Sequence, residues 1–254
     1  MATGRGDITR ALGRLPAVSL SELDERASLL RRIDNKYAVP HEAFLELVHR
    51  LSGDHDVLDM DGRREFAYQT VYFETSGLRC FWDHVESRFP RFKARTRLYE
   101  DTDACVFEVK LKADDDETEK RQVEHPPDRA DELTDSAREC LDSALHAGGL
   151  ALDEPLEPRL RTNFSRITLA ARESPARLTC DVGVRLSAPD GAAVTMSSEL
   201  VLVETKSESG ESPADEVLGE LGVQQVSLSK YRVGMSLVGG AEVREAQPGS
   251  EYFS

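Results

Sequence analysis

The sequence predicts an α+β fold in which a closed antiparallel eight-stranded β-barrel carries peripheral α-helices. Three observations favour this fold. Eight segments, and the residues before Pro40, have the alternation or composition of strands, and eight strands are enough to close a barrel. Only four segments show helical signals. Hydrophobic residues make up 39% of the 254 residues, which is enough for a sizeable core in one main domain.

The predicted strands alternate polar with apolar residues or concentrate β-branched and aromatic ones. An acidic run between Lys112 and Lys120 predicts an exposed connection between two of them. The residues before Pro40 alternate in the same way. The eight segments are residues 66–74, 91–99, 104–112, 119–125, 159–170, 177–186, 199–206 and 229–235.

The predicted helices follow from apolar spacing and from terminal signals. Pro40 suits a first helical turn, and apolar residues follow it at i, i+3, i+4 and i+7 from Phe44 to Leu51. Three more helices are predicted at residues 76–88, 128–146 and 212–222. We expect an N-terminal segment at 1–27, the main domain at 28–236 and a flexible tail at 237–254.

The overall charge excludes two broad classes of function. The chain has 32 basic and 47 acidic residues, a net charge of −15, which disfavours a general nucleic-acid or membrane-surface binder. No apolar run is long enough to span a bilayer, so we expect no membrane insertion. The four cysteines form no C-x-x-C pair and no secretory signal is visible. We therefore expect a cytoplasmic protein.

Charged residues share one face of several predicted strands, although they could simply be solvated there. That face is mostly basic, whereas an external face should share the acidic bias of the chain, so we favour the inside of a barrel. Buried cations need a compensating anion. Arg and Lys bind phosphate oxygens, and a carboxylate can hold Mg²⁺ or Mn²⁺. The residues of these faces are Arg32, Asp34 and Lys36; Arg91, Lys93, Arg95 and Arg97; Glu108, Lys110 and Lys112; Arg177, Thr179 and Asp181; and Glu204 and Lys206.

Eight short motifs follow one another between residues 32 and 231. They are RIDNKY at 32–37, TVYFET at 70–75, FKARTRLYE at 92–100, FEVKLK at 107–112 with KR at 120–121, NFSR at 163–166, ARLTCD at 176–181, LVETK at 202–206 and LSKY at 228–231. In this order the chain resembles the VTC domain, the polyphosphate-polymerase branch of the triphosphate tunnel metalloenzymes, which belong to the CYTH-like superfamily. The resemblance covers residues 30–235, most of the chain.

This resemblance implies a tunnel that binds ATP and inorganic polyphosphate or triphosphate and uses Mn²⁺ or Mg²⁺. Glu204 matches the metal-binding carboxylate, and Glu108 is a second candidate. Two positions depart from the family pattern, which usually has Glu in place of Asp34 and Tyr in place of Phe164. The matching catalytic residues are Lys36, Arg95, Arg97, Arg166, Arg177 and Lys230, and the substrate-binding residues are Lys93, Lys110, Lys120 and Lys206.

Three functions remain open at this point. The first is a polyphosphate polymerase that transfers the γ-phosphate of ATP to a growing chain. The second is a tunnel-type inorganic triphosphatase or nucleoside triphosphatase, and the third is a non-catalytic polyphosphate-binding module. The motif with Arg32, Asp34 and Lys36 favours the first, since related triphosphatases usually carry two glutamates and a lysine there. The presence of Glu204 disfavours the third function, because a site that only binds anions has no use for its negative charge. The oligomeric state stays open.

Overall fold

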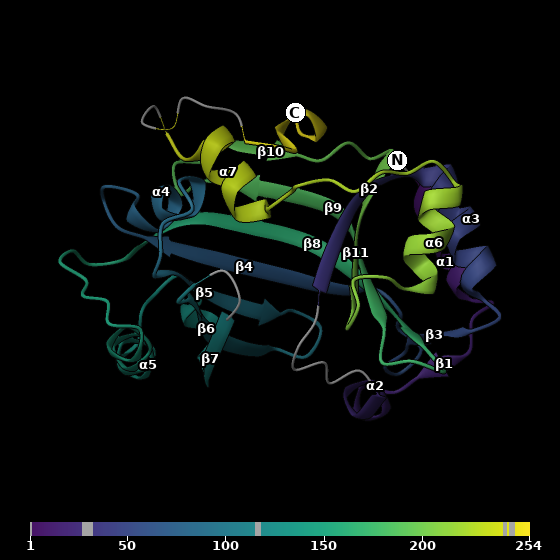
Figure 1. Ribbon diagram of the computed structural model, residues 1–254, viewed down its shortest axis with the longest axis horizontal. Coiled ribbons are helices and arrows are strands. Elements are labelled where there is room, and N and C mark those ends of the chain that lie inside the picture. The colour runs from purple at the N-terminus through teal and green to yellow at the C-terminus, as the bar shows by residue number, and fades with distance from the viewer. Residues whose placement is uncertain (1, 27–32, 115–117, 241–242, 244–246) are drawn as a thin grey trace.

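The structure is a computed structural model that describes residues 2–26, 33–114, 118–240, 243 and 247–254. Its centre is one strongly curved sheet with neighbouring strands in the order β2-β11-β9-β8-β4-β5-β6-β7, all paired antiparallel (Figure 1). Their bounds are β2 Ile33–Pro40, β4 Phe66–Glu74, β5 Arg91–Tyr99, β6 Ala104–Lys112, β7 Thr118–Glu124, β8 Glu157–Ala171, β9 Arg177–Ser187 and β11 Leu200–Ser207.

The predicted class and antiparallel arrangement of eight main strands are confirmed, but closure of the barrel is not. The strands β2 and β7 end the path, and no pairing joins them in the described residues. Closure requires a matching tilt and stagger of all strands, which the alternation within single strands does not encode. Three short strands complete the sheet: β1 Ala17–Val18 pairs in parallel with β3 His55–Leu58, which also pairs with β8, and β10 Ala193–Thr195 pairs with β9.

The strand predicted at residues 229–235 is wrong, because this segment forms helix α7 Lys230–Val238. The Ser229 side chain caps the helix by accepting the backbone N–H of Arg232 at 3.4 Å. Gly234, which weakens a helical pattern in a sequence, is required by packing here. A Cβ at this position would lie 2.6 Å from Leu160 of β8. The helix therefore lies directly on the sheet.

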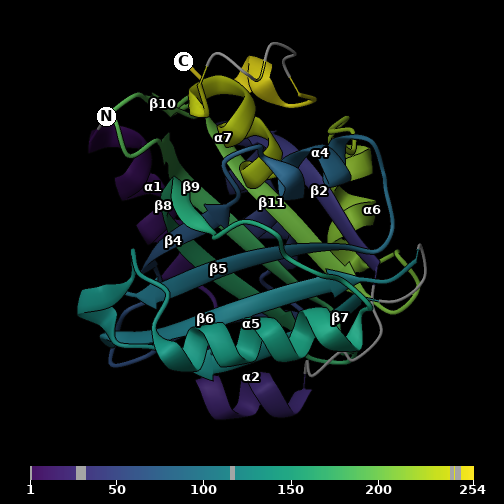
Figure 2. The ribbon, with the colours of Figure 1, turned by 90° about the vertical axis from the view of Figure 1, so that its left-hand side faces the viewer.

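The four predicted helices are confirmed, and two more lie in the N-terminal segment. Helix α5 lies against β6 and β7 (Figure 2), whereas α3 packs on β2 and β11 with α1 and α6 beside it. The confirmed helices are α3 His41–Leu51, α4 Arg79–Val85, α5 Asp135–Ala147 and α6 Pro213–Glu220; the others are α1 Ala2–Leu12 and α2 Leu20–Arg26, and the 3₁₀ turns are η1 Pro127–Arg129 and η2 Ser250–Tyr252.

The apolar core lies between the outer face of the sheet and these helices. Phe107 and Val109 of β6 pack in one buried cluster with Leu141 of α5. On the other side Val203 of β11 packs in a second cluster with Phe44 of α3. Since the helices bury the apolar faces of these strands, the opposite, charged faces line the concave side. The curvature of the sheet therefore turns the charged faces toward one another.

The domain boundaries drawn from the sequence stay predictions, and Arg32 lies outside the described residues. In the last segment, Val243 and Phe253 are buried, and Thr195 and Ser254 exchange backbone hydrogen bonds of 2.8 and 3.1 Å. These residues pack on the body of the protein and are not the loose tail that the sequence predicts. None of the described helices has the length and apolar character needed to cross a membrane.

Candidate functional site

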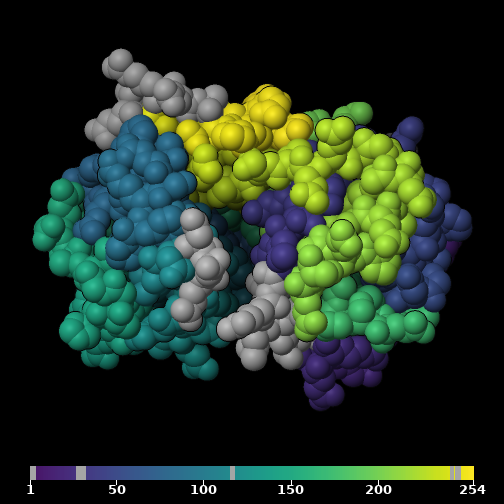
Figure 3. All heavy atoms as spheres, in the orientation of Figure 1, coloured from purple at the N-terminus to yellow at the C-terminus, as the bar shows by residue number. Residues whose placement is uncertain are grey.

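The strand register places the charged residues of neighbouring strands side by side on the same face of the sheet. Arg95 lies opposite Glu108, and Lys93 lies opposite Lys110. On the other side of the molecule Glu204 lies opposite Lys36. Figure 3 shows the surface hollowed where the blue and teal part of the chain faces the purple strand β2. The inward-facing residues therefore form two walls, a β5–β7 wall and a β8–β11 wall that includes the start of α7.

Electrostatic contacts across the hollow show that these walls face each other. Burial lowers the pKa of Lys93 to about 7, and the positive charges of Lys36 on β2 and Lys110 on β6 add to this effect. Lys110 of β6 in turn feels the negative charge of Glu204 on β11. Strands that lie far apart along the sheet are thus neighbours across the concave side. The site is a basic channel.

Glu108 is the only carboxylate among the candidate residues of the β5–β7 wall, and it is fully buried. It accepts a hydrogen bond from Arg95 Nε at 2.7 Å and forms an ion pair with Lys120 Nζ at 2.6 Å. Burial by itself would raise its pKa, but the charges of Arg95, Arg97 and Lys120 hold the pKa far below its usual range. Glu108 therefore stays ionised and orients two cations.

Tyr72 belongs to this wall, although its motif alone suggests a core residue. It is buried, but its hydroxyl accepts a hydrogen bond from Arg95 Nη1 at 3.1 Å. Burial opposes ionisation of the phenol, yet the charges of Arg95 and Arg97 lower its pKa. Together with Glu108, Tyr72 fixes the Arg95 guanidinium from two sides. A hydroxyl at an inward position of β4 is the signal that could have identified it.

Asp181 holds together the opposite wall, and sequence reasoning assigns it no role beyond its place on a charged face. Arg166 Nε and Nη2 donate to its two oxygens at 2.6 and 2.8 Å, and Lys230 Nζ donates to Oδ2. Burial raises the pKa of Asp181, but Arg166 and Lys230 outweigh burial and lower it to about 2. This bidentate pair fixes Arg166 and Lys230 in the channel.

A β-bulge between β8 and β9 determines that Arg166 and Asp181 lie opposite each other. The register between β8 and β9 shifts at Asn163 and Ser165, opposite Gly183 of β9. Gly183 has φ +63°, a conformation that side chains rarely adopt. Beyond the bulge Arg166 lies directly opposite Asp181. A single inserted position therefore aligns the pair, and such an insertion is invisible in the alternation of either strand.

Phe164, one of the two departures from the family pattern, supports cations with its ring. The Arg166 guanidinium lies 5.1 Å and the Lys230 ammonium 4.7 Å from its centroid, within the range of cation–π attraction. Tyr68 stacks on this ring with centroids 5.4 Å apart, and the Arg166 guanidinium lies 5.3 Å from the Tyr68 centroid as well. The missing hydroxyl therefore removes a hydrogen bond donor, but the ring still positions two phosphate-binding candidates.

Glu204 and Lys206 form an ion pair on β11, and Lys206 Nζ also donates to Thr179 Oγ1 at 3.2 Å. Burial raises the pKa of Glu204, but Lys206 and Lys36 hold it far below its usual range. The side chain of Glu204 keeps 23% of its surface exposed to the channel, whereas Glu108 has none. Arg177 lies opposite Lys206 on β9, at the position that the sequence predicts.

The channel carboxylates could hold a divalent ion only together with the phosphates of a bound substrate. No three metal-binding side chains gather in the described ranges. Mg²⁺ and similar ions often bind one or two carboxylates together with waters and substrate phosphates, and the partly exposed Glu204 suits that arrangement. Glu108 would first have to release Lys120. Of the two predicted metal ligands, Glu204 therefore fits better.

Several cations of the channel have no acceptor. The buried Nε of Arg97 has no hydrogen-bond partner in the part of the chain that the structure describes. Over the same residues, Lys93 and Lys110 form no ion pair with a carboxylate. Buried polar groups are normally satisfied, so an unsatisfied cluster of cations calls for an anionic partner.

The channel continues into a cavity of about 400 Å³ between α4, α7 and β2. Lys36, Lys93, Arg91 and Arg232 line it, and Asp34 is the one carboxylate among the described residues of its lining. Burial and the charge of Lys93 lower the pKa of His84, another lining residue, to about 3, so this imidazole is neutral at pH 7. The cavity extends the positive lining beyond the channel itself.

The comparisons with known proteins agree with this geometry. Residues 31–238 match the family described as the VTC domain. A proposed adenylyl cyclase from Hippeastrum, described as having a dominant triphosphatase activity, is 18% identical with a TM-score of 0.52, covering 83% of this chain and 98% of that chain. A proposed adenylate cyclase from Bacillus halodurans is 16% identical with a TM-score of 0.50, covering 78% of this chain and 94% of that chain.

A comparison with curated protein sequences gives no match. At these identities the two structures show a shared fold, and the family is shown by the match over most of the chain. The chain therefore shares its fold with these two structures and belongs to the VTC domain family.

Proposed function

We propose that this protein transfers the γ-phosphate of ATP to the end of an inorganic polyphosphate chain inside the basic channel. The row of cations on β5 carries this proposal. Arg97, Arg95, Lys93 and Arg91 occupy successive inward positions, and the six residue-to-residue steps from Arg91 to Arg97 span about 20 Å. This row is much longer than a triphosphate. It continues into the cavity, which favours a longer polyanion as one of the ligands.

Phosphoryl transfer depends on in-line positioning and on neutralisation of developing charge. Arg95 and Arg97 would bind non-bridging oxygens from one wall, and Arg166 and Arg177 from the other. Lys36 and Lys230 would flank the transferred group. An oxygen of the terminal phosphate of the chain forms a bond to the γ-phosphorus, the bond from that phosphorus to the β–γ bridging oxygen breaks, and ADP leaves. The attacking phosphate is already ionised and needs no general base.

The remaining substrate-binding candidates would hold the polymer. These residues are Lys93, Lys110, Lys120 and Lys206, and each would contribute a point charge to the non-bridging oxygens. A divalent ion, Mn²⁺ or Mg²⁺, would supply charge neutralisation at the phosphates when bound to Glu204. Glu204 is proposed as this ligand because its carboxylate is ionised and partly exposed to the channel.

A triphosphatase is the second candidate function. The Hippeastrum protein, which shares the fold, is described as having a dominant triphosphatase activity. In such a reaction water would replace the polymer as the attacking group at the same site. A non-catalytic polyphosphate-binding module would use the cations in the same way but would have no use for the carboxylate of Glu204.

One experiment distinguishes these functions. The purified protein is incubated with ATP and either Mn²⁺, Mg²⁺ or EDTA, and the products are separated by size and identified. ADP with long-chain polyphosphate supports the proposal, and free phosphate or pyrophosphate supports the hydrolase. Polyphosphate binding with unchanged ATP supports the binding module. The matched control is Arg185→Ala, since Arg185 is an exposed arginine of β9 outside the candidate site.

A further inference from the structure

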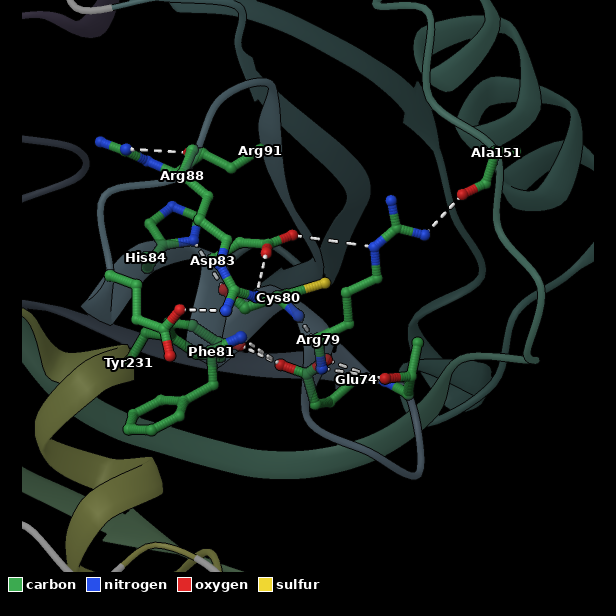
Figure 4. Close-up of polar contacts among 12 residues, drawn as sticks. Glu74, Arg79, Cys80, Phe81, Asp83, His84, Arg88, Arg91, Ala151 and Tyr231 are labelled. Carbon is green, nitrogen blue, oxygen red and sulfur yellow. Dashed lines mark hydrogen bonds and ion pairs between the residues drawn. The ribbon is translucent and has the colours of Figure 1, made fainter.

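A second fully buried carboxylate, Glu74, lies outside the channel at the end of β4. Its Oε1 accepts the backbone N–H groups of Thr75 and Cys80, both at 2.9 Å, and its Oε2 accepts that of Phe81 at 2.8 Å. The Tyr231 hydroxyl also donates to Oε2. Figure 4 shows these contacts meeting at one side chain. Four donors therefore satisfy the hydrogen-bonding capacity of a carboxyl group that burial cuts off from water.

Two of these contacts, those from Cys80 and Phe81, cap helix α4, whereas the Thr75 N–H lies before the helix. Leu78 at the N-cap position provides no side-chain hydrogen bond, so Glu74 supplies the acceptor for the first turn. The fourth contact has a different role, because Tyr231 belongs to α7 and is separated from Glu74 by 157 residues. The carboxylate thus links the end of β4, the start of α4 and the start of α7.

Tyr231 is the only member of this link that also reaches the channel. Its ring lies 5.0 Å from that of Tyr72 and 6.4 Å from that of Phe81, and the Lys93 ammonium lies 5.1 Å over it. Burial and the charge of Glu74 raise the pKa of Tyr231, so the phenol keeps its proton and remains a donor. Its neighbour in sequence is Lys230, which bonds Asp181.

We propose that Glu74 is a positioning residue: by accepting the phenol of Tyr231 it fixes the first turn of α7 and thereby holds Lys230 against Asp181 in the channel. The Lys230 ammonium needs such support. It stands on the first residue of a helix whose first turn lacks an acidic residue, and helix ends fray readily. The expected effect on phosphate binding rests on the proposed function. The claim that Tyr231 and Glu74 hold Lys230 in place does not.

The sharpest variant is Tyr231→Phe, which removes one hydroxyl and leaves the caps of α4 intact. Glu74→Gln is less informative, because its amide would turn N–H groups toward the donors of α4. The matched control is Tyr37→Phe, since Tyr37 also donates to a carboxylate on another helix, that of Asp215 on α6 at 2.7 Å. In the protein without ligand, a small amine-reactive reagent is used and the acylation rate of each lysine is followed by mass spectrometry.

We expect Tyr231→Phe to raise the acylation rate of Lys230 about five-fold, the size of effect that loss of one hydrogen bond produces. Tyr37→Phe should leave that rate unchanged, and Lys120 on the opposite wall should react equally in all three proteins. An unchanged Lys230 rate in folded Tyr231→Phe overturns the proposal. So does an equal rise in Tyr37→Phe, which would indicate a general loss of stability.

Binding of linear polyphosphate provides the second measurement. Tyr231→Phe should weaken binding, and this effect should disappear when Lys230→Ala is already present, because Tyr231 would act through Lys230. Equal weakening in both backgrounds contradicts the positioning role. If the unsubstituted protein binds no polyphosphate, the proposed function fails, while the acylation rates still decide where Lys230 is held.

Discussion

The two walls of the channel carry the same kinds of residue but compensate their charge differently. On the β5–β7 wall five candidate cations face one carboxylate, Glu108, which binds Arg95 and Lys120. On the β8–β11 wall and the adjoining strand β2, five candidate cations face two carboxylates, Asp181 and Glu204, which bind three of them. The first wall therefore keeps positive charge available for an anion, whereas the second holds its cations in a fixed geometry.

This difference assigns separate tasks to the walls. Arg97 and Lys93 of the first wall have no carboxylate partner in the described residues, so an anionic ligand would satisfy them. Arg166 and Lys230 of the second wall are preorganised by Asp181 and by the ring of Phe164. Substitutions in the two walls should therefore have different consequences.

The largest effect is expected at Glu204. Glu204→Gln removes the charge proposed to hold the divalent ion, so product formation should fall to background and the response to Mn²⁺ should vanish. The measurement is a Mn²⁺ titration of product formation. Glu199→Gln is the control, because Glu199 is exposed just before β11. A normal Mn²⁺ response of Glu204→Gln would exclude Glu204 as the ligand.

Loss of one cation from either wall should be nearly as severe. Arg97→Ala and Lys230→Ala should each leave the protein folded and lower kcat/KM at least about 100-fold, as removal of one electrostatic donor does elsewhere. Steady-state kinetics at saturating metal tests this, with circular dichroism as a check of folding. Near-normal activity of either variant would count against its assigned role, and Arg185→Ala should remain fully active.

The pH dependence of binding should come from the first wall. Because the pKa of Lys93 is lowered to about 7, this lysine loses its proton as pH rises through 7, and affinity for a phosphate chain falls with it. Lys110, whose pKa is also lowered to about 7, should add to this effect. Each linked proton should lower the affinity about five-fold between pH 7 and 8. Calorimetric titration of triphosphate at several pH values measures it. Lys93→Gln should flatten the profile, and an unchanged profile would contradict this assignment.

Substitutions in the two walls should also change the free energy of unfolding in opposite directions. Lys93→Gln removes a charge that faces Lys110 directly, so it should raise the free energy of unfolding by about 1 kcal/mol. Lys230→Ala removes a partner of the buried Asp181 and should lower it by about 1–2 kcal/mol. Urea unfolding of both variants tests the contrast. A lower free energy of unfolding in both variants would mean that the positive charge of the first wall is neutralised as fully as that of the second.

The smallest effect is expected from Tyr72→Phe. The variant removes one of the two groups that fix Arg95 but leaves Glu108 in place. Activity should fall about three-fold, in line with a neutral hydrogen bond. A loss as large as that of Arg97→Ala would indicate that the Tyr72 hydroxyl contacts the substrate directly. The kinetic assay used for Arg97→Ala measures this difference.

Much of the fold could be predicted because strand alternation is local. The bounds of β4, β5 and β6 match those expected from the sequence, and the charged faces of β5 and β6 lie on the concave side of the sheet. Helix α7 was missed because its alternating polar and apolar residues and Gly234 are equally compatible with a strand. Only the contact of Gly234 with Leu160 shows why glycine stands in a helix.

The site was harder to predict where it depends on long-range register. Arg166 and Lys230 are recognisable as basic residues in their motifs, but their common partner Asp181 becomes apparent only through the bulge at Gly183. Closure of the barrel depends on all strands at once, and the sheet remains open between β2 and β7 in the described residues. Glu74 was missed because nothing in its motif indicates that Tyr231 reaches it.

The affinity of linear polyphosphates of increasing length tests the central claim most directly. If the cations of both walls and of the adjoining cavity bind one chain, affinity should keep rising beyond triphosphate and should show a stoichiometry of one chain per protein. Arg91→Ala should reduce the gain for long chains while leaving triphosphate binding unchanged, because Arg91 lines the cavity. An affinity that is constant from triphosphate onward would contradict a continuous channel for a phosphate polymer.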